Sequence, residues 1–220
     1  LVGRRLFKKN TIGATTTNKD AVLMMLKYIS GQQLVLMPTT NSAYGSGDEN
    51  NFCSETSPLN PISQYAIDKV EVEGALLEHP LAVSFRLATV FGMSPRMRLD
   101  LLVNDFVYRA VNDRFIVLFE SHFKRNYIHV QDVSRVFQHA IKNADSMAGE
   151  IYNVGLSQAN VSKAELCAEI KKQIPELIVL EEAFAKDPDQ RNYIVSNEKI
   201  ENTGFHPKND LSNGISELIK

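Results

Sequence analysis

Hydrophobic positions along the chain follow two patterns in turn, which predict alternating helices and strands. In residues 18–29, apolar residues recur every three or four positions, as on one face of a helix. Residues 81–87 form a short continuous apolar run, which is typical of a strand buried in a parallel sheet. The predicted helices span residues 18–29, 62–78, 99–111, 130–143, 162–173 and 211–219. The predicted strands span residues 33–37, 81–87, 115–119, 150–154 and 177–180. This alternation predicts an α/β fold.

Turn and cap residues predict where these elements end. Gly31 ends the first helix, while Asn60 and Pro61 have the character of an N-cap and a first helical residue. Residues 44–60 are rich in Gly, Asn, Ser and Asp, and therefore predict a long loop before the second helix.

The beginning of the sequence does not fit this alternation. Residues 1–10 have the pattern of a basic amphipathic helix with no strand before it, and residues 11–17 change character abruptly. A compact α/β domain is expected to carry more sheet ahead of Leu34. We therefore expect that segments of the protein are missing before the first residue, after Asn10 and after Ala14. An intact mass equal to that of the 220 residues would contradict this expectation.

Composition and charge narrow the class of protein. With 220 residues, of which 44% are hydrophobic and 23% charged, the chain can bury one core with a small lobe attached. The net charge of −2 gives no electrostatic reason to expect nucleic acid or an anionic membrane as a partner. No apolar run approaches the ~20 residues of a membrane span, and no signal peptide is recognisable. Cys53 and Cys167 fit no metal or redox spacing, so we expect reduced thiols in a cytoplasmic protein, with one disulfide as the alternative.

Tyr65 and Lys69 are the strongest candidates for chemistry. Their spacing on a predicted helix places both side chains on one face, one turn apart. A cation beside a phenol favours the phenolate, so Lys69 would lower the pKa of Tyr65 toward neutral pH. Thr40 follows a predicted strand, and its hydroxyl could hold a substrate alcohol against the phenol. Together they predict a site that removes a proton from a carbinol while a cofactor accepts the hydride.

Several motifs occur in order along the chain. They are TNSAYG at 40–45, PISQYAIDK at 61–69, FRLATVFG at 85–92, RNYIHVQDV at 125–133, YNVG at 152–155 and DQR at 189–191. Together they resemble the motifs of the extended short-chain dehydrogenase/reductases that act on nucleotide-diphosphate sugars. The family includes sugar epimerases, 4,6-dehydratases and dehydrogenases, and the resemblance covers about residues 11–220. The stretch at 94–105 is similar to a subgroup that acts on GDP-linked heptoses.

The resemblance implies a Rossmann-type, doubly wound parallel sheet that binds NAD, with a small C-terminal substrate-binding lobe. Residues 1–155 would form the NAD-binding domain, with lobe segments inserted after about residue 92. Residues 156–220 would form mainly the lobe. A homodimer is implied as well, through a bundle of the helices at 18–29 and 62–78.

The family's glycine-rich turn, Gly-x-x-Gly-x-x-Gly, is absent from the sequence, and so is the acidic residue that binds the adenosine ribose. Either residues have been omitted, or the protein is a truncated and catalytically inactive relative. Omission is the favoured interpretation, because a remnant has no need for the intact Thr40, Tyr65, Lys69, Arg125 and Arg191.

The resemblance also implies a role for individual side chains. Tyr65 would be the general base, Lys69 would support it and bind the nicotinamide ribose, and Thr40 would bind the reacting hydroxyl. The residues expected at the cofactor are Tyr65, Lys69, Ala88, Thr89 and Val90. The residues expected at the substrate are Thr40, Asn41, Ser42, Arg98, Asn104, Arg125 and Arg191. The arginines suit a pyrophosphate, because guanidinium groups bind phosphate oxygens in a bidentate way.

Two further expectations concern what the site does not do. A dehydratase of this family carries an Asp-Glu pair after the threonine, and Asn41 and Ser42 cannot exchange protons in that way, which disfavours 4,6-dehydration. His129 is expected to be a structural histidine, and no metal is expected.

We therefore expect NAD-dependent oxidation or epimerisation at C4 of a nucleotide-diphosphate sugar. The sequence leaves open whether a 4-keto sugar is released, as in a dehydrogenase, or reduced again, as in an epimerase. The alternative from another class is a non-catalytic relative that binds a partner protein or senses a nucleotide. NAD bound to the purified protein would favour the enzyme.

Overall fold

A three-stranded parallel sheet forms the centre of the computed structural model, which describes residues 11–46, 52–182 and 190–220. Its strands, in the order β1-β2-β6, are β1 (Val35–Thr40), β2 (Ala82–Leu87) and β6 (Glu150–Val154). They coincide with three of the predicted apolar runs, although β1 extends further than predicted, to Thr40. Because the strands are parallel, the carboxyl ends of β1 and β2 meet at one edge, with Thr40 opposite Leu87.

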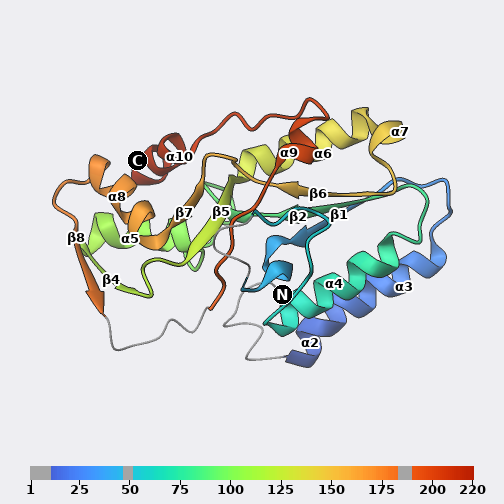
Figure 1. Cartoon of the computed structure of the whole chain (residues 1–220), viewed down its shortest axis with the longest axis horizontal. Helices are drawn as coiled ribbons and strands as arrows, with labels where there is room; N and C mark the ends of the chain where they lie inside the picture. The colour runs from blue at the N-terminus through green and yellow to red at the C-terminus, as the bar shows by residue number, and fades with distance from the viewer. Residues whose placement is uncertain (1–10, 47–51, 183–189) are drawn as a thin grey trace.

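Helices cover both faces of this sheet (Figure 1). On one face, α4 (Gln64–Leu76) connects β1 to β2 and packs beside α3 (Ala21–Tyr28). On the other face lie α6 (Val130–Lys142), α7 (Ala144–Met147) and α9 (Glu198–Glu201). The predicted Rossmann-like α/β fold is therefore confirmed.

One hydrophobic core is shared by β2, β6 and α6, and a second core joins segments that are far apart in the chain. Its elements are α5 (Leu102–Asn112), β4 (Phe115–Phe119), α8 (Lys163–Gln173), β8 (Ile178–Glu182) and α10 (Leu211–Ile219). Phe106, Ile170 and Ile215 pack together in this core, and β4 pairs with β8 in parallel. Segments on both sides of residue 155 thus build the same core.

Three short strands form a small sheet that the sequence analysis missed. They are β3 (Thr89–Phe91), β5 (Lys124–His129) and β7 (Asn160–Ser162), in the order β3-β5-β7. In β5 the polar residues Arg125, Asn126 and His129 are all buried. A strand of this composition has no apolar run that would reveal it.

The first described helix differs from the prediction, which began at residue 18. The chain is helical from Thr11 to Tyr28, through α2 (Thr11–Thr15), the π-helical turn η1 (Thr16–Asp20) and α3. Packing against α4 stabilises this extension, because Thr15 donates a hydrogen bond to the buried Asp68 at 2.9 Å. The helix continues through Ala14, and the expectation that residues are missing after it stays a prediction. The expected break after Asn10 and the predicted helix at 1–10 lie outside the described residues.

The start of α4 also differs from the prediction. The N-cap is Ser63, whose hydroxyl accepts a hydrogen bond from the Ala66 N–H at 3.3 Å. Asn60 instead donates its backbone N–H to the Ala43 carbonyl at 2.9 Å. The predicted capping pair therefore belongs to the loop that precedes the helix.

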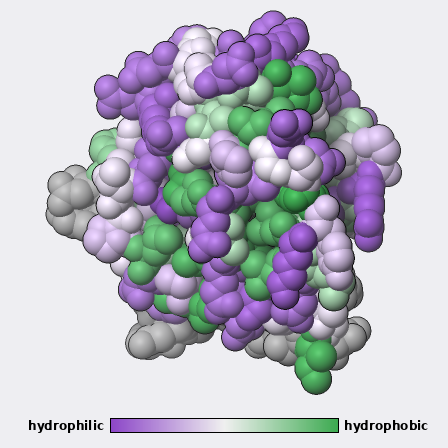
Figure 2. All heavy atoms as spheres, turned by 90° about the vertical axis from the view of Figure 1, so that its right-hand side faces the viewer, coloured by the Kyte–Doolittle hydropathy of each residue, from purple (hydrophilic) through white to green (hydrophobic). Residues whose placement is uncertain are grey.

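Cys53 and Cys167 are both buried free thiols, as predicted. Within the described ranges, the structure contains no helix whose length and apolar character would allow it to cross a membrane. At the end of the molecule that carries α7 and the last turns of α3 and α4, apolar side chains lie among polar ones (Figure 2).

Candidate active site

Thr40 ends β1 at the edge of the sheet, where the chain turns into the 3-10 helix η2 (Asn41–Tyr44). Its hydroxyl caps this helix by accepting a hydrogen bond from the Ser42 N–H at 3.1 Å. Since the oxygen serves as the acceptor, the hydroxyl proton can be donated to a substrate oxygen. Thr40 is therefore fixed in place and oriented by the local fold.

Tyr65 and Lys69 lie in the first two turns of α4, which packs on β1. The Lys69 ammonium donates a hydrogen bond to the Pro38 carbonyl at 3.0 Å, two residues before Thr40. One of its three N–H groups thus holds the helix to the strand, and the others can bind a ligand. Burial lowers the pKa of Lys69. The structure thus brings Tyr65 and Lys69, which were predicted to share a helix face, to the end of β1.

The electrostatics of Tyr65 differ from the prediction. Burial raises the pKa of the Tyr65 phenol, and the positive charges of Arg191 and Arg98 act in the opposite direction. The Lys69 ammonium, which was expected to lower this pKa, donates its hydrogen bond to the Pro38 carbonyl. Two arginines that the family resemblance assigned to the substrate therefore also favour the Tyr65 phenolate.

Arg191 connects the C-terminal segment to this edge of the sheet. Its guanidinium donates a short hydrogen bond to the Ser42 hydroxyl, one residue beyond Asn41. Arg125, buried in β5, donates to the Arg191 carbonyl at 3.4 Å. The two arginines and Ser42 are thus brought together with Tyr65, although they lie far apart in sequence.

Asn104 and Arg98 are engaged mainly in holding a loop. The Asn104 side chain is buried; it accepts a hydrogen bond from the Gly92 N–H at 3.1 Å and donates to the Arg98 carbonyl at 3.0 Å. Arg98 forms an ion pair with Asp100 at 2.7 Å. Asn104 lies in the first turn of α5, and its observed contacts fix the loop from Gly92 to Arg98.

Asn41 has a buried amide whose hydrogen-bonding capacity is unused. It is 0% exposed, and neither its Nδ2 nor its Oδ1 has a partner among the described residues. Leaving such a group unpaired costs about 1–3 kcal/mol, so an unpaired amide in an active site is a candidate ligand contact. It directly follows Thr40 in the chain.

The other predicted cofactor residues lie at the end of β2. Ala88 is buried and donates its N–H to the Val154 carbonyl at 2.9 Å, while Thr89 and Val90 begin the partly buried β3. His129 is structural, as predicted: its Nε2 lies 2.7 Å from Glu217 Oε2 and ties β5 to α10.

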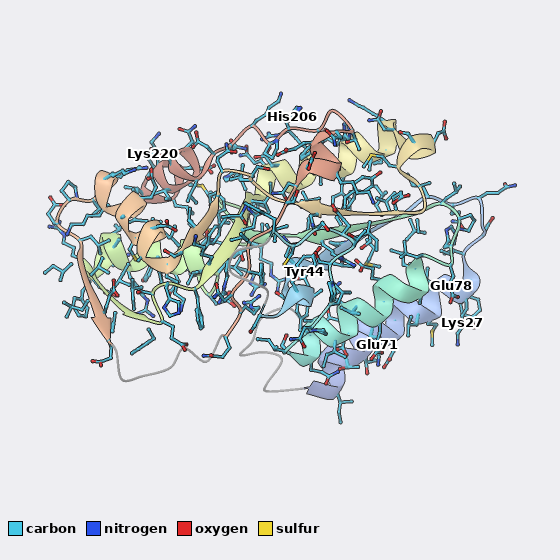
Figure 3. The ribbon with its side chains drawn as sticks, viewed as in Figure 1. Lys27, Tyr44, Glu71, Glu78, His206 and Lys220 are labelled. Carbon is cyan, nitrogen blue, oxygen red and sulfur yellow. The ribbon has the colours of Figure 1, made fainter. Side chains whose placement is uncertain are left out.

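Sequence reasoning missed a buried polar network beneath the site. Glu73 and Arg86 form an ion pair in the interior, and Arg86 donates to the Tyr44 hydroxyl at 3.0 Å. Tyr44 lies inside the molecule, between the sheet and α4 (Figure 3). The available signal was the spacing of Glu73, which lies four residues beyond Lys69 on the same helix.

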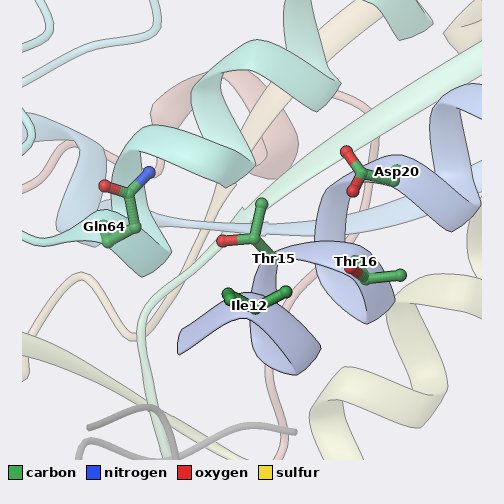
Figure 4. Close-up of a pocket in the computed structure, with 5 residues that line it drawn as sticks. All are labelled: Ile12, Thr15, Thr16, Asp20 and Gln64. Atoms are coloured by element: carbon green, nitrogen blue, oxygen red, sulfur yellow. The ribbon is translucent and has the colours of Figure 1, made fainter. Parts of the chain in front are cut away.

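A surface pocket lies between α2, η1 and the start of α4 (Figure 4). Its walls are formed by Ile12, Thr15, Thr16, Asp20 and Gln64. None of the predicted catalytic side chains lines it. The described residues also contain no cluster of His, Cys, Asp or Glu that could hold a metal ion.

Comparison with known proteins identifies relatives of the chain. The profile of the Epimerase family, described as the NAD dependent epimerase/dehydratase family, matches residues 6–155. An uncharacterised protein of Schizosaccharomyces pombe is 24% identical over 260 aligned residues, covering 97% of this chain and 68% of that protein.

Solved structures of several nucleotide-sugar enzymes share the fold. The UDP-glucose 4-epimerase of Thermotoga maritima, with UDP-glucose, has a TM-score of 0.81 at 22% identity, covering 100% of this chain and 74% of that one. The dTDP-glucose 4,6-dehydratase of Bacillus anthracis, in complex with NAD, has a TM-score of 0.80 at 20% identity over 93% and 67%. The ADP-L-glycero-D-manno-heptose-6-epimerase of Helicobacter pylori has a TM-score of 0.76 at 23% identity over 93% and 65%. At these identities the likeness concerns the fold.

Proposed function

Because the chain belongs to the NAD dependent epimerase/dehydratase family, we propose that it catalyses NAD-dependent oxidation or epimerisation at C4 of a nucleotide-diphosphate sugar. The observation that supports this most directly is the convergence of Thr40, Tyr65 and Lys69 at one edge of the sheet, with Lys69 hydrogen-bonded to β1. The carboxyl edge of a parallel sheet is where ligands bind in folds of this type.

Each side chain has a distinct part in the proposed reaction. The Thr40 hydroxyl donates a hydrogen bond to the C4 oxygen, and the Tyr65 phenolate removes the proton from that oxygen. Lys69 holds α4 against β1 and binds the ribose of the cofactor. In an epimerase the 4-keto sugar is then reduced again on its other face, and in a dehydrogenase it is released.

The residues present fit the nicotinamide end of NAD. Lys69 keeps N–H groups for ribose hydroxyls, and the unpaired Asn41 amide offers a donor and an acceptor beside Thr40. Ala88, Thr89 and Val90 would line the same part of the site. When bound, NAD supplies the acceptor for the C4 hydride. The described residues contain no glycine-rich turn for its pyrophosphate.

The sugar nucleotide would be held by its phosphates. Arg125 donates to the Arg191 backbone carbonyl, and Arg191 donates to the Ser42 hydroxyl. Two guanidinium groups in this region would recognise a pyrophosphate through charge-assisted hydrogen bonds. Arg98 and Asn104 would complete the substrate site from the loop before α5. We propose the lobe built from α5, α8 and α10 as the part that selects the nucleotide.

Dehydration at C6 is the alternative reaction, since dehydratases are among the structural neighbours. Asn41 and Ser42 argue against it, because an amide and a hydroxyl are poor proton donors and acceptors compared with a carboxyl group. A heptose nucleotide is included among the candidate substrates, since the stretch at 94–105 resembles enzymes for GDP-linked heptoses. The non-catalytic alternative would bind NAD or a partner without turnover.

The experiment is incubation of the purified protein with NAD and a panel of UDP-, dTDP-, GDP- and ADP-linked hexoses and heptoses. NMR detects new stereocentres or loss of the C6 hydroxyl, and absorbance detects NADH. Inverted C4 signals or a 4-keto sugar with NADH would support the proposal. A 4-keto-6-deoxy product would replace it with dehydration, and NAD binding without conversion of any sugar would favour the non-catalytic relative.

A further inference from the structure

Tyr65, Lys69 and Glu73 follow one another at intervals of four residues on α4, so their side chains share one face of the helix. The first two belong to the proposed catalytic site, whereas Glu73 lies deeper, at 4% exposure. A buried carboxylate is costly unless it is paired and hydrogen-bonded. Its partners therefore show what this helix face is fixed to.

Arg86 of β2 is the main partner of Glu73. Its Nη2 lies 2.6 Å from Glu73 Oε1 and its Nε lies 3.0 Å from the same oxygen, and both side chains are buried. Two N–H groups on one carboxylate define its orientation as well as its distance. The pair thus joins α4 to the middle strand of the sheet in one geometry.

The second oxygen of Glu73 ties the helix to the strand that carries Thr40. Glu73 Oε2 accepts hydrogen bonds from Thr39 Oγ1 at 3.0 Å and from Ser84 Oγ at 2.6 Å. Thr39 is the residue directly before Thr40 in β1. The position of Thr40 relative to α4 therefore depends on this carboxylate.

The other end of Arg86 holds the segment that follows Thr40. Arg86 Nη1 donates to the Tyr44 hydroxyl at 3.0 Å and to the Glu55 carbonyl at 3.1 Å. Tyr44 ends η2, and its hydroxyl lies 2.7 Å from Asn153 Oδ1 on β6. The network thus fixes residues on both sides of Thr40 and the helix that carries the proposed base.

We propose that Glu73 and Arg86 are positioning residues that set the separation between Thr40 and the pair Tyr65 and Lys69. This inference rests on the proposed function. The ion pair contacts neither substrate nor cofactor; it acts through the strand end and the helix. A displacement of about 1 Å between reacting groups can cost ~10²-fold in rate, so a small relaxation here has a large effect.

The test compares Glu73→Gln with Asp68→Asn as a matched control. Asp68 is also a fully buried carboxyl group of α4, but it faces α2, where it accepts a hydrogen bond from Thr15 at 2.9 Å. For a sugar nucleotide that the wild type converts, we expect kcat of Glu73→Gln to fall ~10²-fold with KM nearly unchanged. Asp68→Asn should retain the wild-type kcat per folded molecule, whatever its melting temperature.

A readout independent of turnover separates this inference from the proposed function. The methyl resonance of Thr40 and the ring resonances of Tyr65, assigned in isotope-labelled protein, should shift in Glu73→Gln and stay in place in Asp68→Asn. If the wild type converts no sugar nucleotide but these shifts occur, the proposed function fails while the positioning role stands. Unmoved resonances, or equal losses of kcat in both variants, overturn the inference.

Glu73→Gln could unfold the protein, because it leaves the Arg86 charge without its partner. The variant Glu73→Gln/Arg86→Gln removes both charges and keeps hydrogen-bonding groups at both positions. Its kcat and the resonances of Thr40 and Tyr65 are measured in the same way. If the folded double variant has the kcat and the resonance positions of the wild type, the inference is overturned.

Discussion

Single residues of the site are held by contacts that leave specific atoms for a ligand. Thr40 uses its oxygen as an acceptor for Ser42 N–H, Lys69 uses one N–H on Pro38, and Asn41 uses neither end of its amide. Burial raises the pKa of Tyr65, so deprotonation of its phenol depends on nearby cations. The chemistry of the site is therefore set by a few atoms, and each can be tested.

Replacing Tyr65 by Phe should remove the general base and leave the remainder of the site intact. We expect kcat to fall by ~10²–10⁴-fold, the usual contribution of general acid–base catalysis, with sugar-nucleotide affinity nearly unchanged. Isothermal titration and steady-state kinetics measure the two effects. Tyr28→Phe is the control, since Tyr28 is 84% exposed on α3. Wild-type turnover in Tyr65→Phe would exclude this residue as the base.

Replacing Arg191 by Gln should move the pH dependence of the reaction. Arg191 lowers the pKa of Tyr65 against the effect of burial, so its loss raises that pKa and the phenolate forms only at higher pH. We expect the alkaline rise of kcat, measured at saturating substrate, to move to higher pH. Arg109→Gln is the control, because Arg109 pairs with Asp105 on the surface of α5. An unchanged pH profile would exclude this electrostatic role.

Replacing Asn41 by Leu should separate stability from binding. The unpaired amide costs stability in the free protein, so we expect Asn41→Leu to unfold at higher urea concentration, by about 1–3 kcal/mol, while its ligand affinity falls. The control is Asn153→Leu, since Asn153 is equally buried but bonded to Cys53 and Ser196 carbonyls, and its loss should destabilise the fold. Lower stability of Asn41→Leu with full affinity would contradict the assignment.

At the scale of elements, the helix pair α3 and α4 presents an apolar surface away from the sheet. Met24 is 61% exposed and Tyr28 84%, on the outer side of α3. Exposed apolar groups of this size on paired helices are characteristic of an interface. We propose that the pair packs against the same helices of a second copy, in a four-helix bundle with two-fold symmetry.

The double variant Met24→Glu/Tyr28→Glu should convert this dimer to a monomer, because it places four carboxylates of two copies in the interface. Sedimentation velocity measures the change. Ile178→Glu/Leu180→Glu is the control, as both residues are similarly exposed on β8 at the other end of the molecule. A wild-type monomer, or a dimer that only the β8 variant disrupts, would place the interface elsewhere.

At the scale of the whole molecule, buried acids of high pKa make stability sensitive to alkali. Burial raises the pKa of Cys167 to about 12 and that of Tyr44 to about 12, and it also raises the pKa of Tyr127. In the unfolded chain these groups lose their protons near their ordinary values, at lower pH. The unfolded state then binds fewer protons than the folded state, so stability falls as pH rises above ~9.

The unfolding free energy measured in urea should therefore decline between about pH 9 and pH 12, and Cys167→Ala should show a shallower decline. The variant is less stable at neutral pH, because it leaves a cavity in the core of α5, α8 and α10. Cys53→Ala is the comparison, as it removes a buried thiol from a different cluster. An identical slope in Cys167→Ala and wild type would contradict this origin.

Much of the fold could be predicted from the sequence because it depends on local patterns of apolar and capping residues. Apolar runs predicted β1, β2, β4, β6 and β8, and the capping box at Ser162 and Glu165 is present in the structure. What was missed is non-local. β5 is polar and is a strand because its backbone pairs with the distant strands β3 and β7. Its buried polar side chains also find distant partners, as Asn126 does at the Leu156 carbonyl and His129 at Glu217.

The sequence by itself determined the class of fold, the chemistry-bearing trio of Thr40, Tyr65 and Lys69, and the absence of carboxyl groups at positions 41 and 42. These follow from residue type and from patterns along the chain. Only the tertiary structure decided that Lys69 bonds to β1, that arginines act on Tyr65, and that Glu73 and Arg86 join helix to sheet. The physical reason is that burial and charge–charge interaction depend on distance in space, which the spacing of residues in the chain does not specify.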